Sequence, residues 1–216
     1  MKIFKCNIHV FLVAALLVSA VACRQNHKDA DLQQPVKNDT LKVHHKPVRS
    51  YHIPKDIAEV KEFYAVWEQK AAGGSFNKVS FEYNCQNEKN GSLTYFFEDG
   101  RLRIMEHAYN EYDHFSATDR YYIADGSPFF VYSREVAWSF EAEGKTKDSV
   151  TEYRGYLVGG KPAKCLVKNY ILRSHGNNPK PEEIPNKVSD CSKMQKLMLE
   201  FQKMANYRQA ADVDCK

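Results

Sequence analysis

Residues 79–102, VSFEYNCQNEKNGSLTYFFEDGRL, decide the fold class. Apolar side chains alternate with polar ones in two runs, first Val79, Phe81, Tyr83 and Cys85 and then Leu93, Tyr95 and Phe97. Alternation with a period of two is typical of strands that bury one face. The Asp99-Gly100 pair that follows tolerates the positive φ angles of a two-residue hairpin turn. This stretch therefore predicts antiparallel β-hairpins.

The same pattern continues to residue 172. Turn signals occur at Asn90-Gly91, Asp99-Gly100, Asp125-Gly126 and Gly159-Gly160. They divide the chain into expected strands at 77–86, 91–98, 101–109, 115–124, 128–134, 135–143, 149–158 and 161–172. Because parallel strands need long crossover connections and no helix-length segment separates these runs, the sequence predicts an antiparallel meander.

A helix is expected at each end of the meander. Residues 54–71 carry an apolar stripe at helical spacing that ends before Gly73-Gly74. A second stripe runs from Met194 to Ala205, after the candidate caps Ser189 and Asp190. Residues 174–188 are expected to form a loop, and residues 206–216 to fray. The predicted fold class is α+β: an open sheet or partial barrel of about eight short strands with two helices packed on it.

The N-terminus is typical of an export signal at residues 1–22. Lys2 and Lys5 precede an apolar run that is too short to span a bilayer permanently. The run ends Ala20-Val21-Ala22-Cys23, which fits both ordinary signal peptidase and the lipobox of bacterial lipoproteins. Position 20 is Ala where the lipobox usually has Leu. The two alternatives are a lipid-anchored protein acylated on Cys23 and a plain secreted protein with one free thiol.

The number of cysteines in the mature chain favours the lipid anchor. After removal of the signal, the chain keeps an odd number of cysteines: Cys23, Cys85, Cys165, Cys191 and Cys215. Acylation of Cys23 leaves four thiols for two disulfides, which exported proteins commonly form. The expected pairs are Cys85–Cys165 and Cys191–Cys215, although four thiols allow three connectivities and the sequence alone does not choose among them.

Residues 23–50 are expected to form a lipidated cysteine and a flexible tether. Residues 24–50 are rich in Gln, Asn, Asp and Lys, have no aromatic residue, and cannot bury enough surface to offset their ordering entropy. Residues 51–216 then form a single domain. The composition of the whole chain is ordinary for a globular protein, with 43% apolar and 27% charged residues, and the net charge of +4 gives little support to nucleic-acid binding.

The sequence has no motif for a catalytic nucleophile, a bound nucleotide or a zinc ion, so no cofactor, metal or catalytic residue is assigned. One polar cluster offers acid–base or metal chemistry, and it consists of Glu106, His107, Glu111, Asp113 and His114. We interpret it as a solvated hairpin loop and keep a hydrolase that uses it as an alternative.

Aromatic residues crowd the middle of the predicted sheet. Both faces of the paired strands carry tyrosines, namely Tyr121, Tyr122 and Tyr132. In a sheet with one solvent-exposed face, apolar and polar residues should alternate more regularly along each strand. Either the helices cover the second face or some of these rings are exposed for ligand contact. The three tyrosines are therefore the candidate ligand-contact residues.

Three hairpin phrases, FFEDGRLRI (96–104), YYIADGSPFFVY (121–132) and YLVGGKPAKCLVK (156–168), resemble uncharacterised bacterial envelope lipoproteins, especially those of Bacteroidetes. This resemblance implies no activity and no site residues. A weaker one concerns the membrane-bound lysozyme inhibitors, which are small disulfide-bonded β-barrel lipoproteins. Tyr83-Asn84-Cys85 is similar to the opening of that family, and residues 116–121 are loosely similar to its Ser-rich inhibitory loop.

The sequence thus predicts a lipid-anchored cell-envelope protein that acts as a non-enzymatic binding or structural module. The outer membrane is favoured over the inner one, and the expected partners are the membrane, reached through the lipid, and an envelope protein or a glycan. The alternatives are a lysozyme-inhibitor-like protein and the hydrolase.

Overall fold

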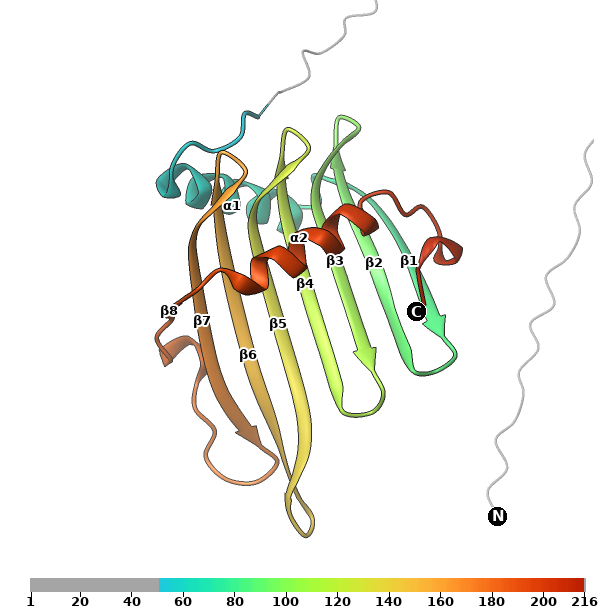
Figure 1. Cartoon of the computed structure of the whole chain (residues 1–216), viewed down its shortest axis with the longest axis vertical. Helices are drawn as coiled ribbons and strands as arrows, with labels where there is room; N and C mark the ends of the chain where they lie inside the picture. Colours follow the sequence, from blue (N-terminus) through green and yellow to red (C-terminus); the bar gives the residue numbers. More distant parts are fainter. Residues whose placement is uncertain (1–50, 216) are drawn as a thin grey trace, which may run out of the picture. The chain divides into compact units, whose positions relative to one another are not determined.

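The computed structural model describes residues 51–215, and within them one antiparallel sheet of eight strands carries two α-helices. The strands lie in the sheet in chain order, so the sheet is an open meander with β1 and β8 at its edges (Figure 1). The predicted α+β class is confirmed. The elements are α1 (Ile57–Ala72), β1 (Asn77–Cys85), β2 (Lys89–Glu98), β3 (Arg101–Glu111), β4 (Phe115–Ala124), β5 (Ser127–Ala142), β6 (Lys145–Val158), β7 (Lys161–Arg173), the 3₁₀ turn η1 (Pro181–Glu183), β8 (Lys187–Ser189), α2 (Ser192–Met204) and η2 (Ala210–Asp212).

The expected strands 128–134 and 135–143 are one continuous strand, β5, which pairs with β6 along nearly its whole length. No turn-forming residue interrupts it. The eighth strand is instead the short β8, which begins at the end of the expected loop 174–188 and includes Ser189, and its Val188 lies opposite Leu166 of β7. Its Lys-Val-Ser sequence is too short to show an alternating pattern.

Three of the four turn signals are confirmed, because Asp99-Gly100, Asp125-Gly126 and Gly159-Gly160 all have positive φ angles between paired strands. The Asn90-Gly91 prediction is wrong. Gly91 lies within β2, and a Cβ there would sit 2.5 Å from the carbonyl oxygen of Ala108. This glycine therefore permits a close approach of strands rather than a turn.

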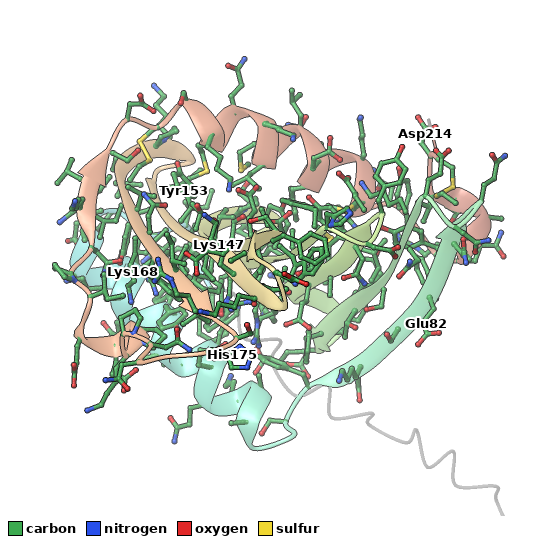
Figure 2. The ribbon with its side chains drawn as sticks, turned by 90° about the horizontal axis from the view of Figure 1, so that it is seen from below. Glu82, Lys147, Tyr153, Lys168, His175 and Asp214 are labelled. Atoms are coloured by element: carbon green, nitrogen blue, oxygen red, sulfur yellow. A yellow bond between two sulfur atoms is a disulfide. The ribbon has the colours of Figure 1, made fainter. Side chains whose placement is uncertain are left out.

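The two helices pack on opposite faces of the sheet (Figure 1). Helix α1 begins after Asp56, whose carboxylate accepts a hydrogen bond from the amide of Glu59 at 2.9 Å. It buries Val60 and Trp67 in an aromatic core, and we call this side of the sheet the α1 face. On the α2 face, Met194, Leu197, Phe201 and Met204 pack on a second core, and Figure 2 shows Tyr153 in the layer beneath the helix.

Four domain cysteines form two disulfides, as expected, but the predicted pairing is wrong. The bonds are Cys85–Cys215 and Cys165–Cys191. Strands β1 and β7 are separated by six strand spacings, roughly 29 Å at about 4.8 Å each, so Cys85 and Cys165 cannot meet. Helix α2 crosses the sheet from β6 and β7 towards β1, and each disulfide ties one end of the C-terminal segment to a strand.

The expected fraying of residues 206–216 is also wrong for the described part of this segment. It contains η2, which contacts β1, and its Tyr207 and Val213 pack against the core of the α2 face. The signal segment, Cys23 and the tether lie outside the described residues. Within residues 51–215 no helix is both long and apolar enough to cross a membrane.

Candidate functional site

A cleft of about 420 Å³ opens beside α1 on the α1 face, and we call it the tyrosine cleft. The sheet contributes even-numbered residues to this cleft, because every second side chain of a strand points to the same face. Tyr122, Phe130 and Tyr156 are opposite one another across β4, β5 and β6, and Arg120, Tyr132 and Arg154 form the next row. Tyr64 of α1 closes the cleft from above the sheet.

Ring faces dominate this cleft. The centroid of Tyr64 lies 5.0 Å from that of Tyr122 and 5.1 Å from that of Phe130, and Phe130 lies 4.9 Å from Tyr156. Tyr64 remains 37% exposed. Burial raises the pKa of Tyr64, with a smaller contribution from Glu68, and burial also raises the pKa of Tyr132. Both phenols therefore stay neutral at physiological pH and can donate a hydrogen bond.

Fixed charges flank the rings. The guanidinium of Arg120 lies 3.1 Å from Glu68 and 3.6 Å from Glu106, and Tyr122 donates a hydrogen bond to Glu68 at 2.9 Å. Arg154 donates to Glu152 at 2.7 Å and lies 5.1 Å from the ring centre of Tyr132. The cleft therefore offers flat apolar surfaces with oriented polar groups at their edges, an arrangement typical of small-ligand sites.

The structure separates the three predicted tyrosines. Tyr122 and Tyr132 line the tyrosine cleft, and their contact with a ligand stays a prediction. Tyr121 points to the opposite face, where it is fully buried beneath α2 and packs on Phe201. The interpretation of Tyr121 as an exposed contact residue is wrong, because one residue step along a strand exchanges the two faces. Tyr64, Arg120 and Arg154 also line the cleft and were not predicted from the sequence. Arg120 and Arg154 have the same strand parity as Tyr122 and Tyr132, and this parity was the available signal.

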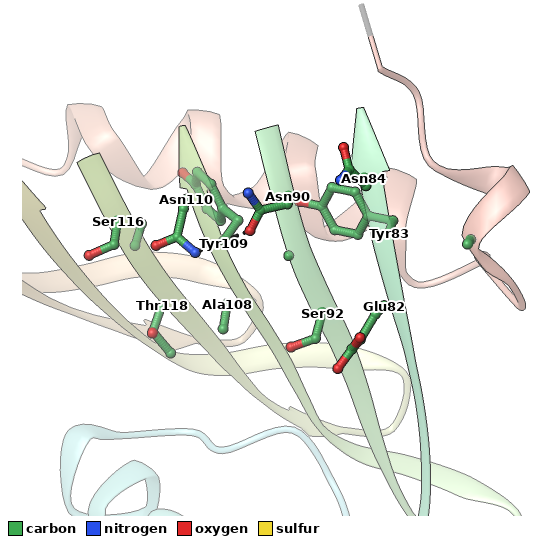
Figure 3. A pocket seen from close by; sticks show the side chains of 13 residues that line it. Glu82, Tyr83, Asn84, Asn90, Ser92, Ala108, Tyr109, Asn110, Ser116 and Thr118 are labelled. Atoms are coloured by element: carbon green, nitrogen blue, oxygen red, sulfur yellow. Dashed lines mark hydrogen bonds between the residues drawn. The ribbon is translucent and has the colours of Figure 1, made fainter. Parts of the chain in front are cut away.

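A second hollow, of about 730 Å³, lies over β1–β4 on the same face, and we call it the polar floor. Figure 3 shows its side chains in two rows, Asn84, Asn90, Asn110 and Ser116 in one and Glu82, Ser92, Ala108 and Thr118 in the other. The pairing register places the members of each row opposite one another on adjacent strands. Thr118 also lines the tyrosine cleft, so the two hollows meet.

A third hollow, of about 710 Å³, lies where the β3–β4 and β5–β6 hairpins end. The ring of His114 stacks on that of Trp138 at 5.0 Å, and Trp138 lies 4.8 Å from Phe140. Phe140 and Tyr112 are 71% and 67% exposed. We call these four residues the hairpin aromatics. Their hollow shares Asn90, Asn110 and Ser116 with the polar floor.

The acidic and histidine residues predicted as one cluster do not converge. Glu106 lines the tyrosine cleft, whereas His107 points to the α2 face and lies 2.7 Å from the hydroxyl of Tyr83. Burial, helped by the charge of Lys89, lowers the pKa of His107 to about 3. Glu111 pairs with Lys89 at 3.0 Å, and Asp113 and His114 lie in the β3–β4 turn. No group of three metal-ligating side chains occurs between residues 51 and 215.

Residues 116–121, which are similar to an inhibitory loop, lie inside strand β4. They form no protruding loop, because both neighbouring strands pair with them. Comparison with family models, curated proteins and solved structures finds no significant match to the chain.

Proposed function

We propose that this protein is exported, anchored in the cell envelope through an acylated Cys23, and acts as a non-enzymatic binding module. The observation that carries the binding role is the tyrosine cleft, where partly exposed ring faces and fixed ion pairs line a concave site on a disulfide-bonded sheet. A rigid platform of this kind lowers the entropic cost of holding a ligand.

The disulfides support the anchor. The four cysteines of residues 51–215 bond to one another, so a mature chain that begins at Cys23 has one thiol left over. The position of that thiol after a short apolar segment fits lipid attachment. The ion pairs support a binding role over catalysis, because Arg120 engages both carboxylates beside it, Glu68 and Glu106.

The anchor is tested by Cys23→Ser in the full-length chain. We expect the wild-type protein to sediment with membranes and the variant to be soluble, because stable anchoring needs two lipid chains. Mass spectrometry of the mature N-terminus should find the acyl groups on Cys23. Cys6→Ser is the matched control and should change neither result, since Cys6 leaves with the signal. An unmodified Cys23, or a Cys23→Ser variant that stays membrane-bound, would show the anchor to be wrong.

The binding role is tested in the Cys23→Ser background, where no lipid contributes to retention. We expect co-sedimentation of this chain with purified bacterial sacculi or outer-membrane vesicles, and Tyr132→Ala should weaken it about tenfold, as loss of a central aromatic contact does. Leu199→Ala is the control, because Leu199 is an exposed residue of α2 on the other side of the sheet. Failure of both fractions to retain the protein, or equal retention of the two variants, contradicts the proposal.

A further inference from the structure

We infer that the three hollows of the α1 face form one groove, and that this groove binds an extended, uncharged oligosaccharide. The inference rests on the proposed binding function and names its ligand class. It is carried by the continuity of the groove, by the neutral polar chemistry of its floor, and by aromatic rings at both of its ends.

The groove is continuous because neighbouring hollows share lining residues. Thr118 belongs to both the tyrosine cleft and the polar floor, and Asn110 and Ser116 belong to both the floor and the hollow of the hairpin aromatics. Along β4 the distance from Tyr122 to Ser116 corresponds to roughly 20 Å of extended strand. The hairpin aromatics lie beyond that point. A site of this length accommodates a chain of several linked units rather than one small molecule.

The chemistry of the floor selects a polar ligand without charge. Its side chains are mainly amides and hydroxyls, which both donate and accept hydrogen bonds, and Glu82 is the one charged residue among those that line it. A polyanion would need clustered Lys or Arg side chains there. The Nδ2 of Asn110 donates to Oδ1 of Asn90 over 3.3 Å, a long contact that leaves both amides able to bind a ligand. Sugar hydroxyls match this surface.

The position of the floor argues against an extended peptide. Peptides that join a sheet bind its edge through their main chain. Here β2, β3 and β4 lie inside the sheet with ladders on both sides, and the free side of the edge strand β1 points away from the floor. A ligand on this surface must therefore contact side chains.

Aromatic rings at both ends of the groove also suit an oligosaccharide. At one end the face of Trp138 stacks with His114, and at the other Tyr64 and Tyr132 are only partly buried. Aromatic faces offer an apolar surface to the C–H faces of sugar rings, while the hydroxyls of the sugar turn towards polar neighbours. Exposed aromatic clusters are uncommon on proteins that bind nothing. The floor and the two ends thus place stacking and hydrogen-bonding groups where one oligosaccharide can reach them together.

The test uses the full-length Cys23→Ser chain on an array of uncharged oligosaccharides. A retained sugar is then titrated as a series from monosaccharide to hexasaccharide and followed by tryptophan fluorescence. Trp138 is the expected reporter, because Trp67 is buried in the core. We expect the hexasaccharide to bind at least about tenfold more tightly than the monosaccharide, since a longer chain fills more of the groove.

Two variants should weaken hexasaccharide binding about tenfold each, Asn110→Ala in the floor and Phe140→Ala at the hairpin end. Phe140 is exposed enough for its replacement to leave the fold intact. Asn169→Ala is the matched control, because Asn169 lies on the α2 face of β7, away from the groove. It should bind like the parent chain.

Absence of binding to every uncharged oligosaccharide, preference for an anionic polymer such as heparin, or affinity independent of chain length would each overturn the inference. If Tyr132→Ala weakens retention by envelope fractions while Asn110→Ala and Phe140→Ala do not, the tyrosine cleft is a binding site and the extended groove is wrong. If none of the three variants has an effect, the proposed function falls as well.

Discussion

Replacing Cys85 and Cys215 together by serine is expected to lower the free energy of unfolding by about 5 kcal/mol, because this disulfide closes the larger loop in the unfolded chain. Its cysteines are 130 residues apart in the sequence, against 26 for Cys165 and Cys191. The same chain-entropy relation gives about 3.5 kcal/mol for the shorter loop. Chemical denaturation followed by circular dichroism measures both losses.

The control for this comparison is Cys23→Ser, which removes a thiol outside both disulfides and should leave the unfolding midpoint unchanged. The unfolding free energies of the two double variants should lie between that of the oxidised wild-type protein and that of the reduced wild-type protein. A larger loss for the Cys165–Cys191 pair than for the Cys85–Cys215 pair would contradict the loop-closure explanation.

Acidification is expected to destabilise the protein through His107. The pKa of this side chain is about 3 in the folded state and near 6.5 in an unfolded chain, since burial disfavours the imidazolium. Between these values the unfolded state binds the proton and the folded state does not, so stability falls as the pH falls. Between pH 6 and pH 4 the titration of His107 should lower the free energy of unfolding by about 2.5 kcal/mol.

His107→Gln isolates this effect. Glutamine does not titrate and can still form a hydrogen bond with the hydroxyl of Tyr83. Titratable groups distant from His107 are the same in both proteins and cancel in the difference. Between pH 6 and pH 4 the free energy of unfolding of the wild-type protein should therefore fall by about 2.5 kcal/mol more than that of the variant. Parallel pH curves would exclude His107 as the cause.

The fold was predictable because its signals are local. Alternation along β1 and β2 and the Asp-Gly and Gly-Gly pairs at the hairpins specify an antiparallel meander without reference to distant residues. The disulfide pairing was not predictable, because it depends on where α2 crosses the sheet. The expected meander already places Cys85 in its first strand and Cys165 in its last, so only closure into a barrel would bring them together. The sheet is open, and six strand spacings separate the two cysteines.

The site was predictable only in part for a related reason. Tyr122 and Tyr132 were predicted because aromatic residues are crowded in the middle of the sheet. Tyr121 was misassigned because the sequence does not show which helix covers which face. Tyr64 belongs to the expected helix 54–71, and the sequence does not show that its ring stays 37% exposed beside the cleft. The hollows themselves depend on which parts of the α1 face the helix leaves open.

The crossing of α2 also decides how the domain responds to tension. The two disulfides link residues 85–165 and 191–215 into one covalent ring. A pull applied between the N-terminal side of the domain and Cys215 passes from β1 directly through the Cys85–Cys215 bond. Strand β1 can peel from β2 under such a load, and the covalent path of the load does not pass along the backbone of β2–β7. The part of the polar floor carried by β2–β4 would therefore keep its shape, whereas Glu82 and Asn84 would leave with β1.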